Sequence, residues 1–389
     1  MRGLSEALDR RLRRNIEAPV AVALSGGGDS LALLLGAAEW AVGAGRRLLV
    51  LTVDHGLNPD SGRWTDACAG VAARIGADFQ ALSWTGHKPV TGLPAAARQA
   101  RHRLLAGAAR AAGARVILLG HTADDLTEAA RMRAAGSTTP SPREWSPSPV
   151  WPEGRGVFLL RPLLQAGRAE LRDWLTARGA PWIDDPANLD LRYARARARQ
   201  QDGAGVERQT QPDPDFARSV VEDAGGLRLP RGRVTRGGLS AALLCAAGTD
   251  RPPRGDRLDR LVEALHGSSP VRATLAGAAV IADADTVRIL REPGRGDLPQ
   301  ASADTPVVWD GRYQVHAPGW TVRALAGLAA RLSDADGAAL RLLHPAARPV
   351  SPALVNAAGA VRLPQPQEAR PLAHARLLAA CGAVTAEPA

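Results

Sequence analysis

Short apolar segments alternate with longer amphipathic or Ala-rich segments through the first half of the chain. The apolar segments have the length of buried strands, and they predict strands at 19–24, 48–53, 78–84, 115–119 and 157–160. The segments between them predict helices at 4–16, 31–41, 61–75, 94–112, 123–135 and 167–178. Strands that alternate with helices favour an α/β fold, a doubly wound parallel sheet covered by helices on both faces.

The second half lacks this regular alternation, and its composition suggests the domain boundaries. A polar region rich in Pro and Gly predicts a linker, followed by helices near 238–267 and short strands near 270–292. Further strand-like segments occur at Thr305–Trp309 and Trp320–Leu325. The predicted organisation is a catalytic domain at 1–205, a linker at 206–235, a helical and β module for substrate at 236–295 and an α+β module at 296–389.

The segment Ser25-Gly26-Gly27-Gly28-Asp29-Ser30 lies between the first predicted strand and the first long helix. A glycine-rich turn before a helix lets backbone N–H groups converge on an anion, and the helix dipole adds to the attraction. Ser25 and Ser30 supply hydroxyl groups, and Asp29 supplies a carboxylate suited to Mg²⁺. The alternative is an ordinary tight turn capped by Asp29 and Ser30.

Two further polar segments follow predicted strands, at Asp54–Leu57 and Gly120–Asp125. Ligands of parallel sheets bind at the carboxyl ends of the strands, so these segments and the glycine-rich turn are predicted to meet. Asp125 and Glu128 are three residues apart and share a helix face, as Asp124 and Glu128 do at four. Such a pair suits Mg²⁺ or an ammonium group, and the alternative is acidic capping of a helix.

Arginine supplies nearly all the positive charge of the chain. The formal net charge is +10 and the pI is about 10.9, which favours a polyanionic partner, although a basic chain without such a partner stays open. Arg98 and Arg101 lie on one predicted helix, and Arg192, Arg195 and Arg199 share a face of another. Both sets suit phosphate or RNA contact, and solvated helix faces are the alternative.

The three cysteines, Cys68, Cys245 and Cys381, are far apart and form no CxxC pair. We therefore expect a reduced, cytoplasmic setting and neither a zinc ribbon nor a redox dithiol. Segment 136–156 is rich in Ser, Pro and Gly and predicts a mobile loop beside the site. The pattern predicts neither a signal peptide nor a membrane span, and it selects no oligomeric state.

Several segments together resemble the tRNA(Ile)-lysidine synthetase family of the PP-loop ATP pyrophosphatases. The hexapeptide Ser25–Ser30 resembles the SGGxDS signature, and the other matching segments follow in the family's order over about 19–200. They are Val53–Leu57, Ala97–Arg101, Gly120–Glu128, Arg161–Leu164, and Asp185–Asn188 leading to Tyr193–Arg195. The departures are His102, Leu126, Ala129 and Ala196, where the family usually has Tyr, Gln, Thr and Asn.

The resemblance implies that ATP and Mg²⁺ are used to attach free L-lysine to the wobble cytidine of a tRNA(Ile) with a CAU anticodon. It implies that Ser25–Ser30 bind ATP, that Asp29 holds Mg²⁺ and that Asp125 and Glu128 bind lysine. With Asp29, Asp125 and Glu128, Arg195 is implied to be catalytic. The implied phosphate or RNA contacts are Arg98, Arg101, His121, Arg192 and Arg199, and the module at 296–389 is implied to bind the tRNA body.

Other functions remain open at this point. A PP-loop tRNA sulfur transferase would use the same activation but needs catalytic or cluster-binding cysteines. An amide-forming relative fed by glutamine would usually carry a glutaminase domain. A non-catalytic basic RNA-binding protein would not need Asp29, Asp125 and Glu128 at strand ends.

Overall fold

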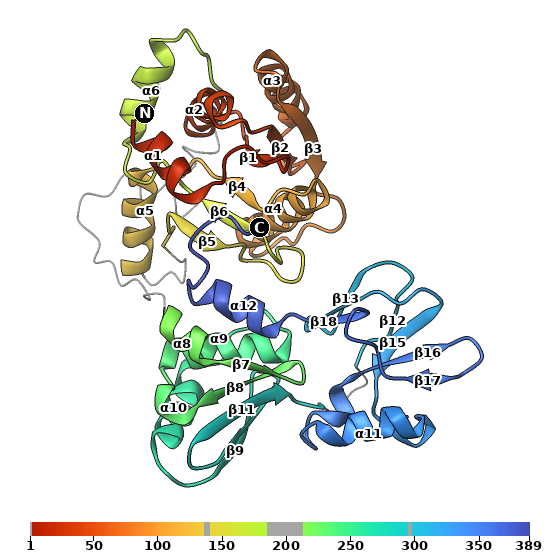
Figure 1. Ribbon diagram of the computed structural model, residues 1–389. Helices are drawn as coiled ribbons and strands as arrows, with labels where there is room; N and C mark the ends of the chain where they lie inside the picture. The colour runs from red at the N-terminus through yellow and green to blue at the C-terminus, as the bar shows by residue number, and fades with distance from the viewer. Residues whose placement is uncertain (1, 136–140, 185–212, 295–297) are drawn as a thin grey trace. The chain divides into compact units, whose positions relative to one another are not determined.

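The computed structural model describes residues 2–135, 141–184, 213–294 and 298–389 (Figure 1). The chain divides into two compact units, of which the first comprises Met1–Thr210 and Val384–Ala389 and the second Gln211–Ala383. In the described part of the chain, none of the helices has the length and apolarity needed to cross a membrane.

The first unit is built on a six-stranded sheet of order β3-β2-β1-β4-β6-β5. All neighbouring strands are parallel except the edge pair of β5 and β6. The strands are β1 (Val20–Ala23), β2 (Leu48–Asp54), β3 (Asp78–Ser83), β4 (Val116–Leu118), β5 (Trp145–Pro147) and β6 (Phe158–Leu160). The helices are α1 (Arg2–Arg11), α2 (Gly28–Ala44), α3 (Ser61–Arg74), α4 (Leu93–Ala111), α5 (Ala123–Ala134) and α6 (Arg168–Thr176).

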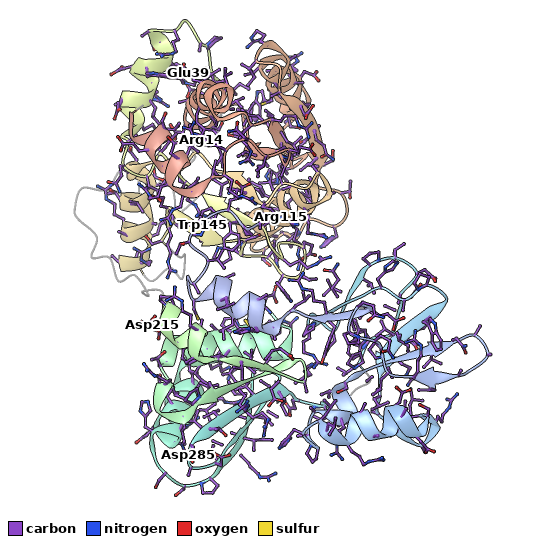
Figure 2. All side chains as sticks on the ribbon, viewed as in Figure 1. Arg14, Glu39, Arg115, Trp145, Asp215 and Asp285 are labelled. Atoms are coloured by element: carbon purple, nitrogen blue, oxygen red, sulfur yellow. The ribbon has the colours of Figure 1, made fainter. Side chains whose placement is uncertain are left out.

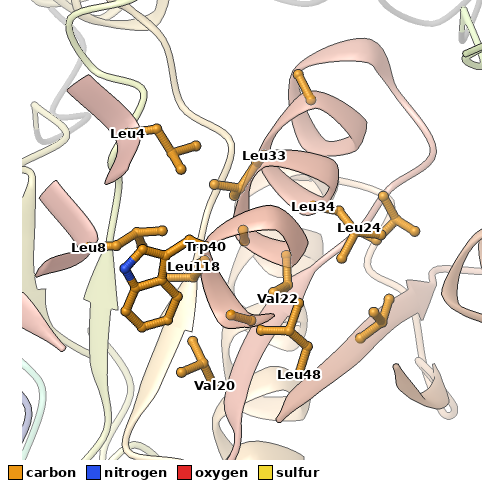
Figure 3. Packing of buried hydrophobic residues seen from close by; sticks show 14 of the residues in the cluster. Leu4, Leu8, Val20, Val22, Leu24, Leu33, Leu34, Trp40, Leu48 and Leu118 are labelled. Atoms are coloured by element: carbon orange, nitrogen blue, oxygen red, sulfur yellow. The ribbon is translucent and has the colours of Figure 1, made fainter. Parts of the chain in front are cut away.

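Both faces of this sheet are buried, which confirms the doubly wound prediction. Val20 and Val22 point into one core with Leu8 of α1 and Trp40 of α2 (Figure 3). Ala21, between the two valines, belongs to the core on the other face, which α4 covers. Consecutive residues of a strand face opposite sides, so continuous apolar strands are what a sheet covered on both faces requires.

The prediction of a mobile loop at 136–156 is wrong for residues 145–147. Residues 145–147 form β5 at the edge of the sheet, antiparallel to β6. Trp145, labelled in Figure 2, stacks on Phe158 with ring centroids 4.9 Å apart. The stacked aromatic pair and the strand pairing hold this segment in place. Its Ser, Pro and Gly content suggested a loop, but it also contains a tryptophan that packs on β6. Residues 136–140 lie outside the described residues.

The last residues of the chain belong to the first unit, not to the module predicted at 296–389. The Glu387 carboxylate pairs with the Arg46 guanidinium at 2.8 Å, and neither side chain is exposed to solvent. The Glu387 N–H donates to the Arg11 carbonyl at 2.8 Å, and Trp145 Nε1 donates to the Val384 carbonyl at 2.8 Å. Residues 384–389 therefore complete the packing of the sheet domain.

The second unit contains an antiparallel sheet of order β7-β8-β11-β10-β9 with four helices. The elements are α8 (Pro214–Ser219), β7 (Val221–Asp223), β8 (Gly226–Pro230), η2 (Arg231–Arg233), α9 (Arg236–Ala247), α10 (Gly255–His266), β9 (Val271–Leu275), β10 (Ala278–Ala282), β11 (Thr286–Arg291) and α12 (Ala373–Ala380). The linker prediction is wrong for 213–230, because Phe216, Leu227 and Leu229 lie in the core of this sheet. Residues 206–212 lie outside the described residues.

The remainder of the second unit consists of two small antiparallel sheets, of orders β12-β15-β16-β17 and β13-β14-β18. The elements are β12 (Ala301–Ser302), β13 (Val307–Trp309), β14 (Tyr313–Val315), β15 (Trp320–Ala324), η3 (Ala329–Arg331), α11 (Asp334–Leu342), η4 (Arg348–Val350), β16 (Pro352–Asn356), β17 (Val361–Arg362) and β18 (Ala369–Pro371). The predicted strands at Thr305–Trp309 and Trp320–Leu325 are confirmed as β13 and β15. By contrast, α12 packs into the core of the five-stranded sheet through Ala373 and Leu377, so the predicted module ends before it.

Candidate active site

The glycine-rich turn Ser25–Ser30 connects β1 to α2 and is folded by its own serines. The Ser30 hydroxyl donates to the Gly27 carbonyl at 2.9 Å and lies 3.1 Å from the Ser25 hydroxyl, while the Ser25 N–H donates to Ser30 Oγ at 3.2 Å. Gly27, the residue before α2, makes no side-chain capping bond. The first N–H groups of α2 therefore have no side-chain acceptor from the cap, which is the arrangement of a helix N-terminus that binds an anion.

The turn requires glycine for two separate reasons. Gly26 has a φ of +83°, in the left-handed region that glycine favours. A Cβ on Gly26 would lie 2.6 Å from Ile183 Cδ1, and the Ile183 N–H donates to the Gly26 carbonyl at 3.0 Å. A Cβ on Gly28 would meet the Trp182 ring at 3.5 Å. Residues 182–183 thus pack against the turn. The sequence pattern does not predict this contact.

The second strand-end segment packs directly on the first. A Cβ on Gly120, just after β4, would lie 3.0 Å from the backbone carbonyl of Asp29. Only glycine allows this approach, which brings the start of α5 beside the start of α2. The expectation that strand-end segments meet is confirmed for Ser25–Ser30 and Gly120–Asp125.

Asp125 has the capping role left open above and also faces the site. Its Oδ2 accepts the Thr122 N–H at 2.7 Å, which closes a capping box at the start of α5. Its Oδ1 lies 3.7 Å from the guanidinium of Arg168. Asp125 is 5% exposed and Glu128 is 3% exposed, so these two of the three acids of α5 are buried. Asp125 therefore caps the helix with one carboxylate oxygen, Oδ2, and faces the site with the other, Oδ1.

Arg168, which the sequence analysis does not single out, joins the two acidic segments. Its Nε donates to Asp29 Oδ2 at 3.1 Å, and its Nη1 donates to Glu128 Oε1 at 3.2 Å. Burial opposes the charge of Arg168, but the hydrogen bond and charge of Asp29, together with Glu128, raise its pKa above the ordinary value. The sequence did contain one sign of this role, because Arg168 falls in the first turn of a predicted helix. A cation there is unfavourable to the helix dipole and calls for an acidic partner.

A cationic cluster lies on the other side of Gly120. Arg161 Nε donates to His121 Nδ1 at 3.2 Å, and burial, with the charges of Arg98 and Arg101, lowers the pKa of Arg161 to about 10. Burial, with the same three arginines, lowers the pKa of His102 to about 3, so this histidine is neutral at pH 7. Arg161 donates hydrogen bonds to His121, the Arg143 carbonyl and Ser146, none of which is acidic. Buried cations that repel one another suit a bound anion.

The third strand-end segment, Asp54–Leu57, forms a turn next to this cluster. Asp54 Oδ1 accepts the Gly56 N–H at 2.7 Å, and Lys88 Nζ donates to the Gly56 carbonyl at 3.0 Å. His55 lies edge-on to Trp84 with ring centroids 6.0 Å apart. Burial first, and then the charge of Arg101, lowers the pKa of His55. Arg101 thus connects this turn electrostatically to the cationic cluster.

Comparisons with known proteins agree on one family. A family model described as "PP-loop domain" matches residues 4–202. The tRNA(Ile)-lysidine synthase of Caulobacter vibrioides is 51% identical, over 91% of this chain and 88% of that protein. The tRNA(Ile)-lysidine synthases of Hyphomonas neptunium and Mesorhizobium japonicum are 36% and 34% identical, over 75% and 91% of this chain and 85% and 86% of those proteins.

The chain belongs to the tRNA(Ile)-lysidine synthase family. Of the family segments recognised in the sequence, the structure brings together Ser25–Ser30, Gly120–Glu128 and Arg161, with Arg168 added between the acids. Arg192, Arg195 and Arg199 lie outside the described residues, so their assigned roles stay predictions.

The Mg²⁺ that the sequence resemblance implies can be compared with the acids present. Among the described residues, no group of three or more His, Cys, Asp and Glu side chains is arranged to hold a metal ion. Mg²⁺ in nucleotide sites takes one or two carboxylates and completes its shell with phosphate oxygens and water. Asp29, at the first turn of α2, fits such a single-carboxylate site.

Proposed function

We propose that this member of the lysidine synthase family ligates free L-lysine to the wobble cytidine of tRNA(Ile) with a CAU anticodon, consuming ATP and releasing AMP and pyrophosphate. The observation that carries the proposal is the contact of Arg168 with Asp29 of the glycine-rich turn and Glu128 of α5. That contact joins the glycine-rich turn, to which we assign ATP, and an acid of α5, to which we assign the cationic amine, through one side chain.

In the first step, the cytosine carbonyl oxygen forms a bond to the α-phosphorus of ATP, and the bond to pyrophosphate breaks. Ser25–Ser30 and the N–H groups at the start of α2 hold the phosphates. Arg98, Arg101 and Arg161 form the cationic cluster, and we assign them to stabilising the negative charge that develops on pyrophosphate. Asp29 would hold Mg²⁺, which would neutralise phosphate charge.

In the second step, the lysine ε-amine attacks the activated cytosine carbon, and AMP leaves with the former carbonyl oxygen. A free ε-amine has a pKa of about 10.4, so the ammonium group loses a proton before it attacks. Asp125 and Glu128 bind the ammonium group and lie beside the departing proton. Placing the base, the nucleotide and the amine together supplies much of the acceleration.

The rival function, a tRNA sulfur transferase, needs a reactive or cluster-binding cysteine. All three cysteines are free and buried. Burial raises the pKa of the Cys68 thiol, and it raises those of Cys245 and Cys381 to about 12 and about 11. Thiols held protonated in this way are poor nucleophiles. Free thiols also fit the reducing cytoplasm, where we place the reaction.

The decisive experiment gives the purified protein ATP, Mg²⁺, tRNA(Ile) with a CAU anticodon and labelled lysine. Incorporation of label together with AMP and pyrophosphate supports the proposal. Transfer of sulfur, or ATP cleavage without incorporation, contradicts it.

Glu128→Gln is expected to lower lysine incorporation about 100-fold while AMP formation on tRNA stays within a few-fold of wild type. The amide keeps the size of the side chain but removes the charge that holds the ammonium group. Glu170 is an exposed residue of α6, so Glu170→Gln is the matched control and should leave both activities unchanged. Equal loss of adenylation and lysine transfer in Glu128→Gln would contradict the assignment.

We also propose that the second unit binds the tRNA body. A cavity of about 580 Å³ in this unit is lined by Arg251, Arg254, Arg257 and Arg291, with Asp310 as its one acid. Asp310 is paired with Arg291 at 3.2 Å and with Arg312 at 2.8 Å. The cavity therefore presents three exposed arginines for which the described residues show no acidic partner, and these suit RNA phosphates.

Replacing Arg251, Arg254 and Arg257 together by Ala is expected to weaken tRNA binding and to reduce the slope of log K against log salt by about 2–3. The turnover rate at saturating tRNA should stay near wild type, because the site chemistry lies in the first unit. Exposed Arg233, in the same unit, provides the control variant Arg233→Ala. An unchanged tRNA affinity of the triple variant would contradict the proposal.

A further inference from the structure

Arg168 is held at the site from its backbone as well as from its side chain. It is the first residue of α6, and its N–H donates to Asp124 Oδ2 at 2.8 Å. This bond ties the start of α6 to the start of α5. The guanidinium then reaches Asp29, Asp125 and Glu128 at 3.1, 3.7 and 3.2 Å. The Arg168 guanidinium thus lies within ion-pair distance of three carboxylates, one on α2 and two on α5.

The same two acids of α5 are the proposed receptors of the lysine ammonium group. The side chains of Asp125 and Glu128 are 5% and 4% exposed, whereas that of Arg168 is 20% exposed. The guanidinium therefore pairs with both acids, and it is the more accessible partner in each pair. A second cation brought to the same oxygens would lie close to the like charge of the guanidinium, and this repulsion favours withdrawal of the guanidinium.

We propose that Arg168 is a displaceable counter-ion of the lysine site, which holds the acids of α5 in place and releases them to the lysine ammonium group. This inference rests on the proposed function. In the empty site the guanidinium offsets carboxylates that are costly to bury without a partner. When lysine binds, its ammonium group takes the Glu128 and Asp125 oxygens, and Arg168 keeps its contact with Asp29.

The displaced guanidinium then has a second effect as a positioning residue. It remains one side chain away from the ammonium group, and a neighbouring like charge lowers the pKa of an ammonium group. Loss of a proton from the amine to a carboxylate of α5 becomes easier, which the attack on cytosine requires. Asp29, which contacts Arg168 directly, links this event to the nucleotide side of the site.

The test measures the KM for lysine in Arg168→Ala with and without methylguanidinium. If Arg168 competes with lysine, the variant has a KM for lysine about five- to tenfold below wild type. Methylguanidinium refills the vacated position and raises that KM competitively, while it leaves the wild-type KM unchanged. Both results together support the proposal.

If Arg168 had a purely structural role, the KM for lysine would change in the opposite direction. The KM for lysine would rise in Arg168→Ala, and methylguanidinium would lower it by restoring the packing of the acids. Either a raised or an unchanged KM overturns the proposal. Arg168→Gln, which keeps hydrogen-bonding capacity without charge, should show the same lowered KM and replaces Arg168→Ala if that variant does not fold. Arg168→Lys keeps a cation and should keep the wild-type KM.

Failure of this inference can be told apart from failure of the proposed function. Wild-type protein that incorporates lysine into tRNA establishes the function whatever the variants do. Wild-type protein that forms no lysyl product defeats the function, and the competition experiment then has no KM to measure and the counter-ion role is overturned with it.

Discussion

Replacing Asp29 by Asn lowers ATP-dependent AMP formation on tRNA by an expected factor of about 100 to 1,000. Asp29 lies at the first turn of α2, beside the glycine-rich turn, where a carboxylate can hold Mg²⁺ against the triphosphate. It is also one of the acids around Arg168, at 3.1 Å. The amide preserves shape but removes the charge on which both tasks depend. Single-turnover release of AMP and pyrophosphate measures the loss.

Two comparisons make this prediction specific. Glu39 lies on the same helix, and its pair with Arg178 is exposed, so Glu39→Gln should leave AMP formation unchanged. Raising the Mg²⁺ concentration should recover part of the activity of Asp29→Asn if the carboxylate holds the metal. A variant that adenylates tRNA at the wild-type rate would exclude Asp29 from the first step.

The glycine-rich turn could be found from sequence because every requirement for it is local. The glycines, the serines and the following helix lie within one short segment, and the parallel sheet then fixes which other segments meet it. Gly120 beside Asp29 is an example, since the two segments follow adjacent strands β1 and β4. Strand alternation thus predicted the edge of the sheet at which the site forms.

Arg168 and Arg161 could not be identified as site residues in the same way. Arg168 is 139 residues from Asp29 in sequence, and the chain contains many other arginines. Only the folded contacts distinguish it from a solvated helix residue. Its position in a first helical turn, unfavourable for a cation, was the one local signal. Arg161 is buried, as Arg46, Arg231 and Arg312 are, and sequence periodicity does not report burial for a residue that follows a strand.

The predicted domain boundaries were wrong where the composition of a segment and its hydrophobic periodicity point to different structures. Around β8, Leu227 and Leu229 alternate with exposed Arg228 and predict a strand, but the neighbouring Pro and Gly suggest a linker. The alternation is the better guide, because it reports which face is buried. Residues 384–389 show no periodic pattern at all, and their place in the first unit depends on long-range contacts such as the pair of Arg46 and Glu387 and the hydrogen bond from Trp145 to Val384.

Replacing Glu387 by Ala is expected to lower the free energy of unfolding of the first unit by about 3–5 kcal/mol. The Glu387 carboxylate accepts two hydrogen bonds from Arg46, at 2.8 and 2.9 Å, and a third from the Arg13 N–H at 2.9 Å. The Arg46 guanidinium also donates to the Ala18 carbonyl at 2.9 Å, so it cannot turn to solvent without losing that bond. Removing Glu387 therefore leaves a buried, uncompensated cation.

Hydrogen exchange locates this loss within the molecule. Protection should fall in β2, which follows Arg46 in sequence, and in β1, which follows its hydrogen-bond partner Ala18, and should stay unchanged in β10 of the second unit. Asp78→Ala is the matched control, because the pair of Asp78 and Arg47 is exposed on both sides and should contribute less than about 1 kcal/mol. A loss as small as that of Asp78→Ala would mean that the last residues merely rest on the sheet domain. A large loss confined to the first unit would mean that the catalytic domain is completed by residues 384–389, which return to it after the whole second unit.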